Sequence, residues 1–294
     1  MKKASIFAIN FLQSARLLAK SAPHCKQLNQ LPEIIAREIK DRGPISFARF
    51  MELALYCPVY GYYEKEEDKT GRGGDFYTSV SVGSLFGQLL AFRFAEWLNS
   101  GLGTGGGPEG GKSESAAVQI LEAGADDGRL ARDILTWLRE RRPALFEQVE
   151  YVISEPSTAQ RERQAKSLVE FPRVRWIDDI GDASRVCGII FSNELLDAMP
   201  VHRYGWDASR RGWFEWGVGV EGNRFEWTRL EGAPGAGVAG LPAQLREALP
   251  DGFIIEESPA ASAWWGRAAR ALERGKLVTL DYGLIADEML MPER

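Results

Sequence analysis

The chain of 294 residues is long enough to bury one sizeable core, or a core and a smaller lobe. With 45% hydrophobic and 26% charged residues it has the composition of a globular protein. A net charge of −5 offers no basic footprint for nucleic acid, and no apolar run is long enough to span a membrane as a helix. The three cysteines are scattered without a CxxC pair, which argues against a zinc site and fits a reducing compartment.

The first 32 residues contain no acid, but they contain lysine and arginine among serine, alanine and leucine. This composition is compatible with a mitochondrial targeting segment and with the irregular start of a bacterial chain. We favour the second interpretation. It predicts a bacterial cytoplasmic protein, with the mitochondrial matrix as the alternative.

The N-terminal third of the chain predicts helices. Apolar residues recur at helical spacing, and Ser46 is placed to cap the second helix. A glycine-rich segment at 99–115 then predicts a surface connection. We therefore expect a helical lobe over residues 31–100. Its helices are expected at 31–40, after Ser46 and at 84–98.

From residue 116 onward, apolar runs of strand length alternate with helical patterns. This rhythm predicts a parallel, doubly wound α/β sheet of Rossmann-like type over residues 116–294. Short aromatic runs predict an antiparallel β-ribbon inserted at about 201–257. The last helix is expected to end at Gly275, since glycine is favoured just after helices. The strands are expected at 118–122, 149–154, 174–177, 188–191 and 276–280, and the helices at 129–141, 158–168 and 260–274.

An acid and a glycine turn follow the first of these strands. Glu122 ends the strand, and Gly124 and Gly128 bracket the turn into the next helix. Glycine lets a ligand approach the backbone closely, at the carboxyl end of parallel strands where open α/β sheets bind ligands. A carboxylate there suits the cationic amino-acid part of S-adenosylmethionine and would repel the pyrophosphate of NAD. A tight turn without a ligand is the alternative.

Further acids follow the next two strands. Glu155 ends the second strand, where a carboxylate can accept hydrogen bonds from both hydroxyls of a ribose. Asp178 and Asp179 follow the third strand, and Asp179 is the candidate contact for the edge of an adenine. The alternatives are an exposed glutamate before Pro156 and a solvated pair of aspartates.

The fourth strand ends in a polar cluster of Asn193, Glu194 and Asp197. Polar groups directly after an apolar strand are costly unless they face solvent or a ligand. The cluster is therefore a candidate part of the pocket, with helix capping by Asn193 as the alternative.

Taken together, the segments resemble the MidA-like family of class I methyltransferases, which includes a mitochondrial complex I assembly factor that methylates an arginine of a core subunit. The resemblance extends over nearly the whole chain from Leu31. The matching segments are residues 44–47 with 60–63, 74–79 with 85–87, the turn after Glu122, 155–156, 193–202 and 280–283.

The resemblance implies S-adenosylmethionine as the cofactor and a loop that folds over it. It implies that Asn193 and Glu194 line the pocket, and that the substrate is an arginine guanidinium of another protein. By the same resemblance, a respiratory complex I subunit is the candidate partner. Glu194 and Asp197 are then the candidate carboxylates that orient the guanidinium by bidentate hydrogen bonds. The covering loop contains Gly74, Asp75, Phe76 and Thr78.

Two departures from the family pattern bear on activity. Asp126 stands where the family has a middle glycine, although aspartate tolerates left-handed backbone better than most residues. The family also continues beyond Arg294, so we expect two strands to be missing and Val278 and Leu280 to lie on an exposed edge. The alternatives are an inactive adaptor that binds a respiratory-complex subunit and, less favoured, a nicotinamide-dependent oxidoreductase, since the turn holds no G-x-G-x-x-G.

Overall fold

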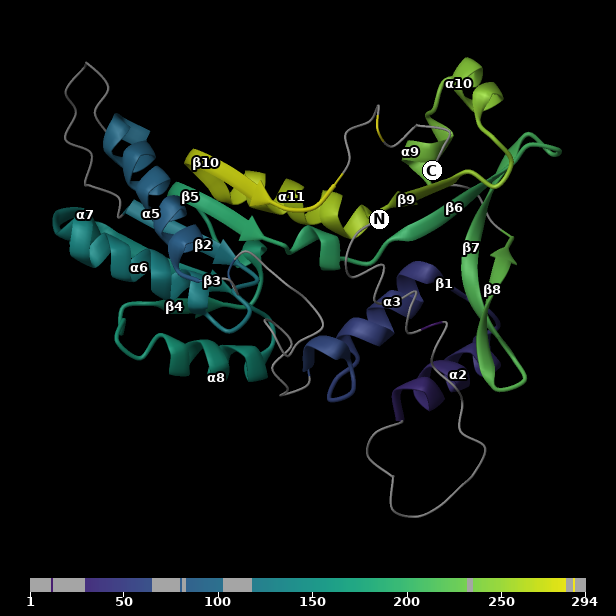
Figure 1. Cartoon of the computed structure of the whole chain (residues 1–294), viewed down its shortest axis with the longest axis horizontal. Helices are drawn as coiled ribbons and strands as arrows, with labels where there is room; N and C mark the ends of the chain where they lie inside the picture. Colours follow the sequence, from purple (N-terminus) through teal and green to yellow (C-terminus); the bar gives the residue numbers. More distant parts are fainter. Residues whose placement is uncertain are drawn as a thin grey trace, which may run out of the picture. The chain divides into compact units, whose positions relative to one another are not determined.

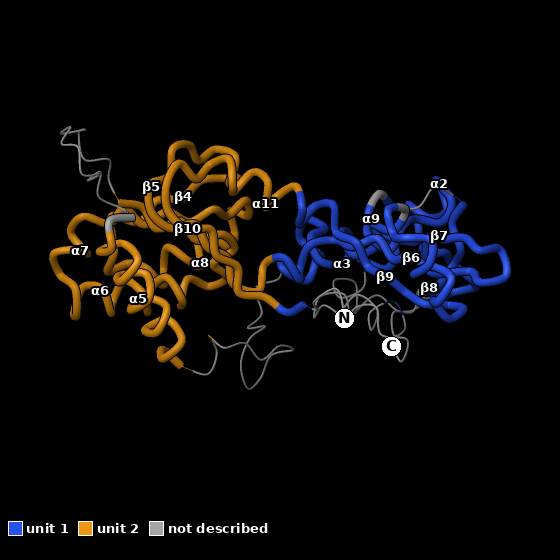
Figure 2. Tube along the Cα trace, turned by 90° about the horizontal axis from the view of Figure 1, so that it is seen from above, with its two compact units in different colours: residues 1–65, 196–262, 282–294 blue, residues 66–195, 263–281 orange. Residues whose placement is uncertain are grey.

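The computed structural model describes residues 12, 30–64, 80, 83–102, 118–231, 235–283 and 288. The chain forms two compact units, each built from segments that are distant in sequence (Figure 2). Residues 66–195 and 263–281 form the parallel-sheet unit. Residues 1–65, 196–262 and 282–294 form the ribbon unit.

The parallel-sheet unit contains one five-stranded sheet in the order β10-β5-β2-β3-β4, and every pairing in it is parallel (Figure 1). From β2 the chain proceeds to β3 and β4 on one side, then to β5 and β10 on the other, so the strand order reverses beside β2. This confirms the predicted Rossmann-like α/β fold. Its elements are α5 (Leu85–Trp97), η2 (Leu98–Leu102), β2 (Val118–Ala123), α6 (Arg129–Arg141), α7 (Pro143–Gln148), β3 (Val149–Ser154), α8 (Thr158–Ser167), β4 (Arg175–Ile177), η3 (Ile180–Asp182), β5 (Val186–Asn193) and β10 (Leu272–Leu280).

The core of this unit lies where α5 and α6 pack with the strands. In α6, Leu130, Ile134 and Leu138 recur at helical spacing, and all three are buried. Helix α5 approaches α6 closely at Gly87, where an added Cβ would lie 2.6 Å from the Cβ of Asp133. Glycine at this position therefore permits the close packing of the two helices.

The prediction for the end of the last helix was wrong. Helix α11 (Pro259–Ala271) ends before the predicted 274, because β10 already begins at Leu272 and pairs with β5. Gly275 is a strand residue with φ 141°. Its added Cβ would lie 1.8 Å from the carbonyl oxygen of Gly188, and that of Gly188 would lie 2.1 Å from the carbonyl oxygen of Gln119. Close approach of neighbouring strands, rather than helix capping, requires glycine at 275.

The ribbon unit contains an antiparallel sheet in the order β1-β7-β6-β9, with β8 also paired to β7. The aromatic runs form β7 and β8, which confirms the predicted antiparallel ribbon. The elements are α2 (Gln30–Arg42), β1 (Ile45–Ser46), α3 (Phe47–Tyr56), η1 (Tyr62–Glu64), η4 (Leu196–Ala198), β6 (His202–Asp207), β7 (Gly212–Glu221), β8 (Arg224–Leu230), α9 (Ala236–Ala239), α10 (Ala243–Ala248) and β9 (Ile254–Glu257).

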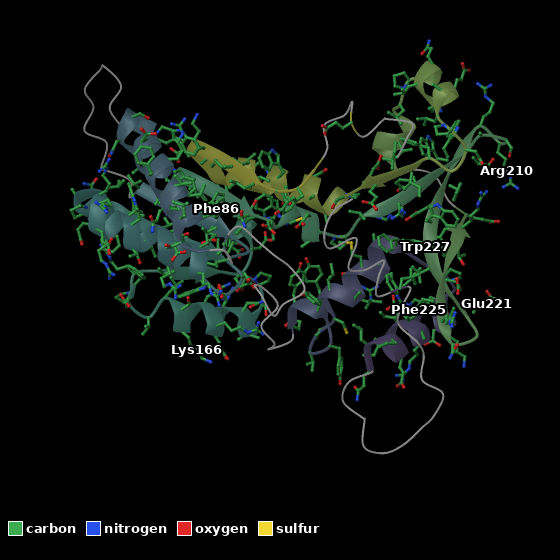
Figure 3. All side chains as sticks on the ribbon, viewed as in Figure 1. Phe86, Lys166, Arg210, Glu221, Phe225 and Trp227 are labelled. Atoms are coloured by element: carbon green, nitrogen blue, oxygen red, sulfur yellow. The ribbon has the colours of Figure 1, made fainter. Side chains whose placement is uncertain are left out.

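Aromatic side chains join α3 to this sheet. The ring centroids of Phe47 and Trp227 are 5.0 Å apart, and those of Phe50 and Phe225 are 5.3 Å apart. Figure 3 labels Phe225 and Trp227 on β8. Ser46 caps α3 as predicted, since its Oγ accepts a hydrogen bond at 3.1 Å from the backbone N–H three residues on.

The two units group the segments differently from the lobe at 31–100 and the domain at 116–294 that the sequence suggested. Helices α2 and α3 belong with the ribbon, because β1 between them pairs with β7 through Ile45 and Val218. Helix α5 belongs with the parallel sheet, because it packs on α6. A strand of two residues is too short to give a periodic signal, so its pairing left no trace in the sequence pattern.

Candidate functional site

The turn after β2 runs through left-handed backbone. Gly124 has φ 70°, Asp126 has φ 45° and Gly128 has φ 80°. An added Cβ on Gly124 would lie 2.8 Å from Cδ1 of Leu195, and one on Gly128 would lie 3.3 Å from Cα of Gln164. Asp126 thus takes a backbone conformation that L-residues rarely adopt.

Glu122 lies at the carboxyl end of β2 and is only 1% exposed. The hydroxyl of Tyr151, on the neighbouring strand β3, donates a hydrogen bond to Glu122 Oε2 at 2.6 Å. Burial, with a smaller contribution from the Asp127 carboxylate, raises the pKa of Glu122 to about 7 against the lowering effect of the Tyr151 hydrogen bond. A buried carboxyl of this kind holds its charge readily only beside a cation.

Glu155 lies at the carboxyl end of β3, and its side chain is also buried. Its carboxylate accepts hydrogen bonds from the backbone N–H of Ser157, at 3.0 Å to Oε1, and from Nε2 of Gln164, at 3.1 Å to Oε2. Its backbone N–H donates to the carbonyl oxygen of Ile177, the last residue of β4. The exposed glutamate that was the alternative for this position is thereby excluded.

Gln164 was not among the residues predicted for the site. Gln164 lies in α8 with no exposed surface, and it connects the turn after β2 to Glu155. The buried residues of α8 are Gln160 and Gln164, four residues apart on one face. Glutamine instead of an apolar residue on a buried helix face is the signal that could have revealed it.

The aspartates after β4 are engaged within the protein. Asp179 caps η3: its Oδ1 accepts from the N–H of Gly181 at 2.7 Å, and Arg267 lies at 3.3 Å from the same oxygen. Asp178 forms an ion pair with Arg161. Both carboxylates are exposed, and the contact of Asp179 with an adenine stays a prediction.

The polar cluster after β5 falls at the boundary between the units. Asn193 is the last residue of β5 and pairs with Leu280 of β10. Glu194 has φ 51°, and its N–H donates to the Leu280 carbonyl oxygen at 2.8 Å. Asp197 is buried in η4, which belongs to the ribbon unit. Asn193 and Glu194 thus lie at the end of the parallel sheet, whereas Asp197 belongs to the ribbon unit.

The carboxyl ends of β2, β3 and β5, with Glu122, the turn at 124–128, Glu155 and Asn193, are called the acid edge below. The predicted covering loop lies outside the described residues: Gly74, Asp75, Phe76 and Thr78.

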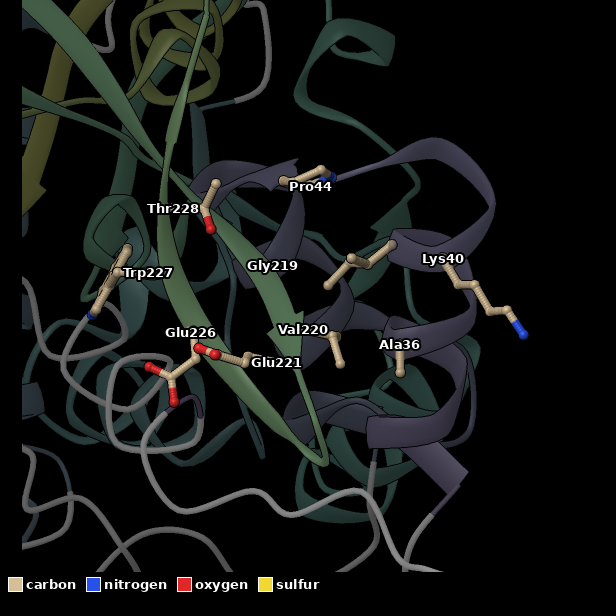
Figure 4. Close-up of a pocket in the computed structure, with 10 residues that line it drawn as sticks. Ala36, Lys40, Pro44, Gly219, Val220, Glu221, Glu226, Trp227 and Thr228 are labelled. Carbon is tan, nitrogen blue, oxygen red and sulfur yellow. The ribbon is translucent and has the colours of Figure 1, made fainter.

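A groove of about 580 Å³ lies in the ribbon unit, lined by α2 and by the hairpin of β7 and β8 (Figure 4). Lys40 and Glu226 are among its lining residues. It belongs to a different unit from the acid edge and is not part of this site. In the described part of the chain, no group of three or more His, Cys, Asp or Glu side chains is arranged to hold a metal ion. None of the helices described is long and apolar enough to cross a membrane.

The chain matches a known protein family along most of its length. Residues 95–293 match the family described as "Putative S-adenosyl-L-methionine-dependent methyltransferase", which is more than half of the chain. The chain belongs to this methyltransferase family. The match includes every strand of the parallel sheet and the turn after Glu122.

Two solved structures and several curated proteins resemble this family member. A protein from Burkholderia thailandensis, bound to S-adenosyl-homocysteine in its crystal structure, is 31% identical with a TM-score of 0.71; the match covers 90% of this chain and 66% of that one. A native structure from the same organism gives a TM-score of 0.70. The protein arginine methyltransferases NDUFAF7, mitochondrial, of mouse and human are 29% and 28% identical over 268 residues. This chain spans only 58% and 57% of their lengths.

Proposed function

We propose that the protein binds S-adenosylmethionine at the acid edge and transfers its methyl group to an arginine guanidinium of a protein substrate. The observation that carries the proposal is the left-handed turn after β2 flanked by two buried carboxylates, Glu122 and Glu155. They stand where the strand order reverses, the usual binding place of open α/β sheets. The relative bound to S-adenosyl-homocysteine supports this assignment.

The residues of the acid edge fit this cofactor in charge. Glu122 is buried with a raised pKa, so a neighbouring ammonium group, such as that of the methionine part, would favour its ionised form. The Glu155 carboxylate, oriented by the Ser157 backbone N–H and the Gln164 amide, is suited to accept hydrogen bonds from a ribose diol. A pyrophosphate would instead meet Glu122 and the turn aspartates, which argues against a dinucleotide.

The remaining cofactor contacts are assigned by the family resemblance. We propose that the loop with Gly74, Asp75, Phe76 and Thr78 covers the cofactor, and that Asn193 lines the pocket. Asp179 is the proposed contact for the adenine edge, in competition with its capping of η3.

The cofactor supplies an electrophilic methyl group on a sulfonium. A guanidinium nitrogen that accepts this methyl group would release one proton to solvent, and S-adenosylhomocysteine would leave with the electron pair of the broken S–CH₃ bond. Because arginine is cationic at neutral pH, the protein must orient it and direct electron density to the reacting nitrogen. We propose that Glu194 and Asp197 do so by bidentate hydrogen bonding, which holds the two reactants at attacking distance.

The arginine acceptor is supported by the printed names of the mouse and human relatives, which are protein arginine methyltransferases. The family resemblance further suggests a respiratory complex I subunit as the partner. The test is incubation of the purified chain with methyl-labelled S-adenosylmethionine and candidate protein substrates, followed by amino-acid analysis.

We expect label in methylarginine and a loss of at least tenfold in rate for Glu194→Gln. Undiminished turnover in Glu194→Gln would contradict the role of that residue. Label in lysine, with S-adenosylhomocysteine still bound, would contradict the assignment of arginine as the acceptor. Binding of S-adenosylhomocysteine without any label in the substrates would contradict the methyltransferase activity and identify an inactive adaptor.

A further inference from the structure

Gln164 connects three segments of the parallel-sheet unit through its side-chain amide. Nε2 donates to the backbone carbonyl oxygen of Asp126 at 3.0 Å and to Oε2 of Glu155 at 3.1 Å. Oε1 accepts from Nε1 of Trp176, on β4, at 2.8 Å. The amide thus contacts the turn after β2, the end of β3 and the strand β4.

These partners permit only one orientation of the Gln164 amide. An indole N–H can only donate, so Oε1 must face Trp176. A backbone carbonyl and a carboxylate can only accept, so the NH₂ group must face Asp126 and Glu155. Flipping the amide would place a carbonyl oxygen against two acceptors and an NH₂ group against a donor, and every hydrogen bond would be lost.

The backbone of α8 also approaches the turn at this residue. A Cβ on Gly128 would lie 3.3 Å from Cα of Gln164, so the glycine is what lets the helix and the turn come together. Burying a glutamine is costly unless all its polar groups have partners, and an apolar side chain would serve packing alone equally well. The arrangement therefore points to a task for the amide beyond filling space.

We propose that Gln164 is a positioning residue for the cofactor, which holds the carboxylate of Glu155 and the left-handed turn at Asp126 in one common geometry. This inference rests on the proposed function, because it assigns the ribose to Glu155 and the methionine part to the turn. Gln164 itself need not touch the cofactor. It acts through the orientation of the two groups that do.

The test is calorimetric titration of the full chain with S-adenosylhomocysteine and with its 2′-deoxy analogue. Gln164→Met keeps the length of the side chain and removes its hydrogen bonds. We expect this variant to bind S-adenosylhomocysteine roughly ten- to a hundredfold more weakly, as for loss of a hydrogen bond to a charged group. The affinity for the 2′-deoxy analogue should fall much less, so the ratio of the affinities for the two ligands should become smaller.

A second arm uses the double variant with Glu155→Gln. If Gln164 acts through Glu155, the two substitutions should be non-additive, and Gln164→Met should have little further effect once Glu155 is replaced. Trp176→Phe keeps a ring in place and removes the donor that orients the amide. Trp176→Phe should reduce the ratio of the affinities for the two ligands as well, by a smaller factor. This variant replaces Gln164→Met in the test if Gln164→Met fails to fold.

The matched control is Gln119→Met. Gln119 also donates its amide to a carboxylate of β3, Glu150, at 2.7 Å, but at the amino ends of the strands. Its replacement should leave affinity for both ligands unchanged. Thermal unfolding of each variant without ligand separates loss of stability from loss of binding.

Unchanged ribose preference in Gln164→Met, or equal loss for the two ligands, would overturn the proposal, because a merely structural residue would behave so. Additivity with Glu155→Gln would overturn it as well. Failure of the unmodified, folded chain to bind S-adenosylhomocysteine would instead contradict the proposed function. The two failures are thus distinguished by the unmodified chain.

Discussion

Among single residues, Glu122 has the largest electrostatic consequence for the acid edge. The carboxyl is buried, and its pKa is raised from 4.5 to about 7. A carboxyl with a raised pKa binds its proton more tightly in the folded chain than in the unfolded one. Stability of the chain without cofactor is therefore lost as pH rises from about 4.5 to about 7, and the cost is complete above this range.

Replacing Glu122 by Gln should remove this cost. Gln accepts the hydrogen bond from Tyr151 and carries no charge, so at pH 8 the free energy of unfolding should rise by on the order of 1 to 3 kcal/mol. At pH 4.5 the variant and the unmodified chain should differ little. Urea unfolding at both pH values measures this, and a larger gain at pH 4.5 than at pH 8 would contradict the assignment.

The same carboxyl makes cofactor binding depend on pH in the opposite direction. An ammonium group beside Glu122 favours its ionised form, so affinity for S-adenosylhomocysteine should increase as pH rises through about 7. Glu122→Gln should bind more weakly at pH 8 and lose this dependence. A pH profile that is identical in the two proteins would show that Glu122 does not face the amino group.

Asp126 is the other residue of the acid edge whose replacement gives a clear prediction, because its backbone is left-handed. Its φ of 45° is tolerated by aspartate and is unfavourable for a β-branched residue. Asp126→Val should lower the free energy of unfolding by about 1 to 2 kcal/mol and weaken S-adenosylhomocysteine binding. Asp126→Gly, the matched control, should keep both properties, as measured by urea unfolding and calorimetry. If Val were as stable as Gly at this position, the left-handed turn would be in doubt.

At the level of elements, the pairing of β5 with β10 depends on Gly275. An Ala at 275 would place its Cβ 1.8 Å from a backbone oxygen of Gly188, and backbone cannot move aside as a flexible side chain can. Gly275→Ala should therefore destabilise the chain by more than about 2 kcal/mol. Gly266→Ala in α11 meets only Arg270 Nη1 at 3.4 Å and should stabilise it by about 0.5 to 1 kcal/mol. Equal midpoints of urea unfolding for the two variants would contradict this account of β10.

Local patterns predicted the elements whose signals are local. The helix at Arg129–Arg141 and the strand at Val149–Ser154 have the predicted bounds, because apolar periodicity and flanking breakers mark both ends. The end of α11 was missed because residues from Leu272 onward pair with β5, and a helical pattern cannot reveal such a long-range pairing. The acidic residues of the candidate site were predicted because they lie at the ends of predicted strands. Gln164 was not, because its role depends on three segments that meet only in the fold.

For the molecule as a whole, the boundary between the two units falls between Leu195 and Leu196, within the segment assigned to catalysis. The proposed cofactor contacts of Glu122, the turn and Glu155 lie within the parallel-sheet unit alone. The described geometry therefore bears most directly on cofactor binding.

The central measurement is calorimetric titration of the purified full chain with S-adenosylhomocysteine. We predict a dissociation constant on the order of micromolar, at least tenfold weaker for Glu155→Ala. Glu150→Ala, which removes a carboxylate from the amino end of the same β3 strand, should bind as the unmodified chain does. No binding by the folded chain, or equal affinity of Glu155→Ala and the unmodified chain, would contradict the assignment of the acid edge as the cofactor site.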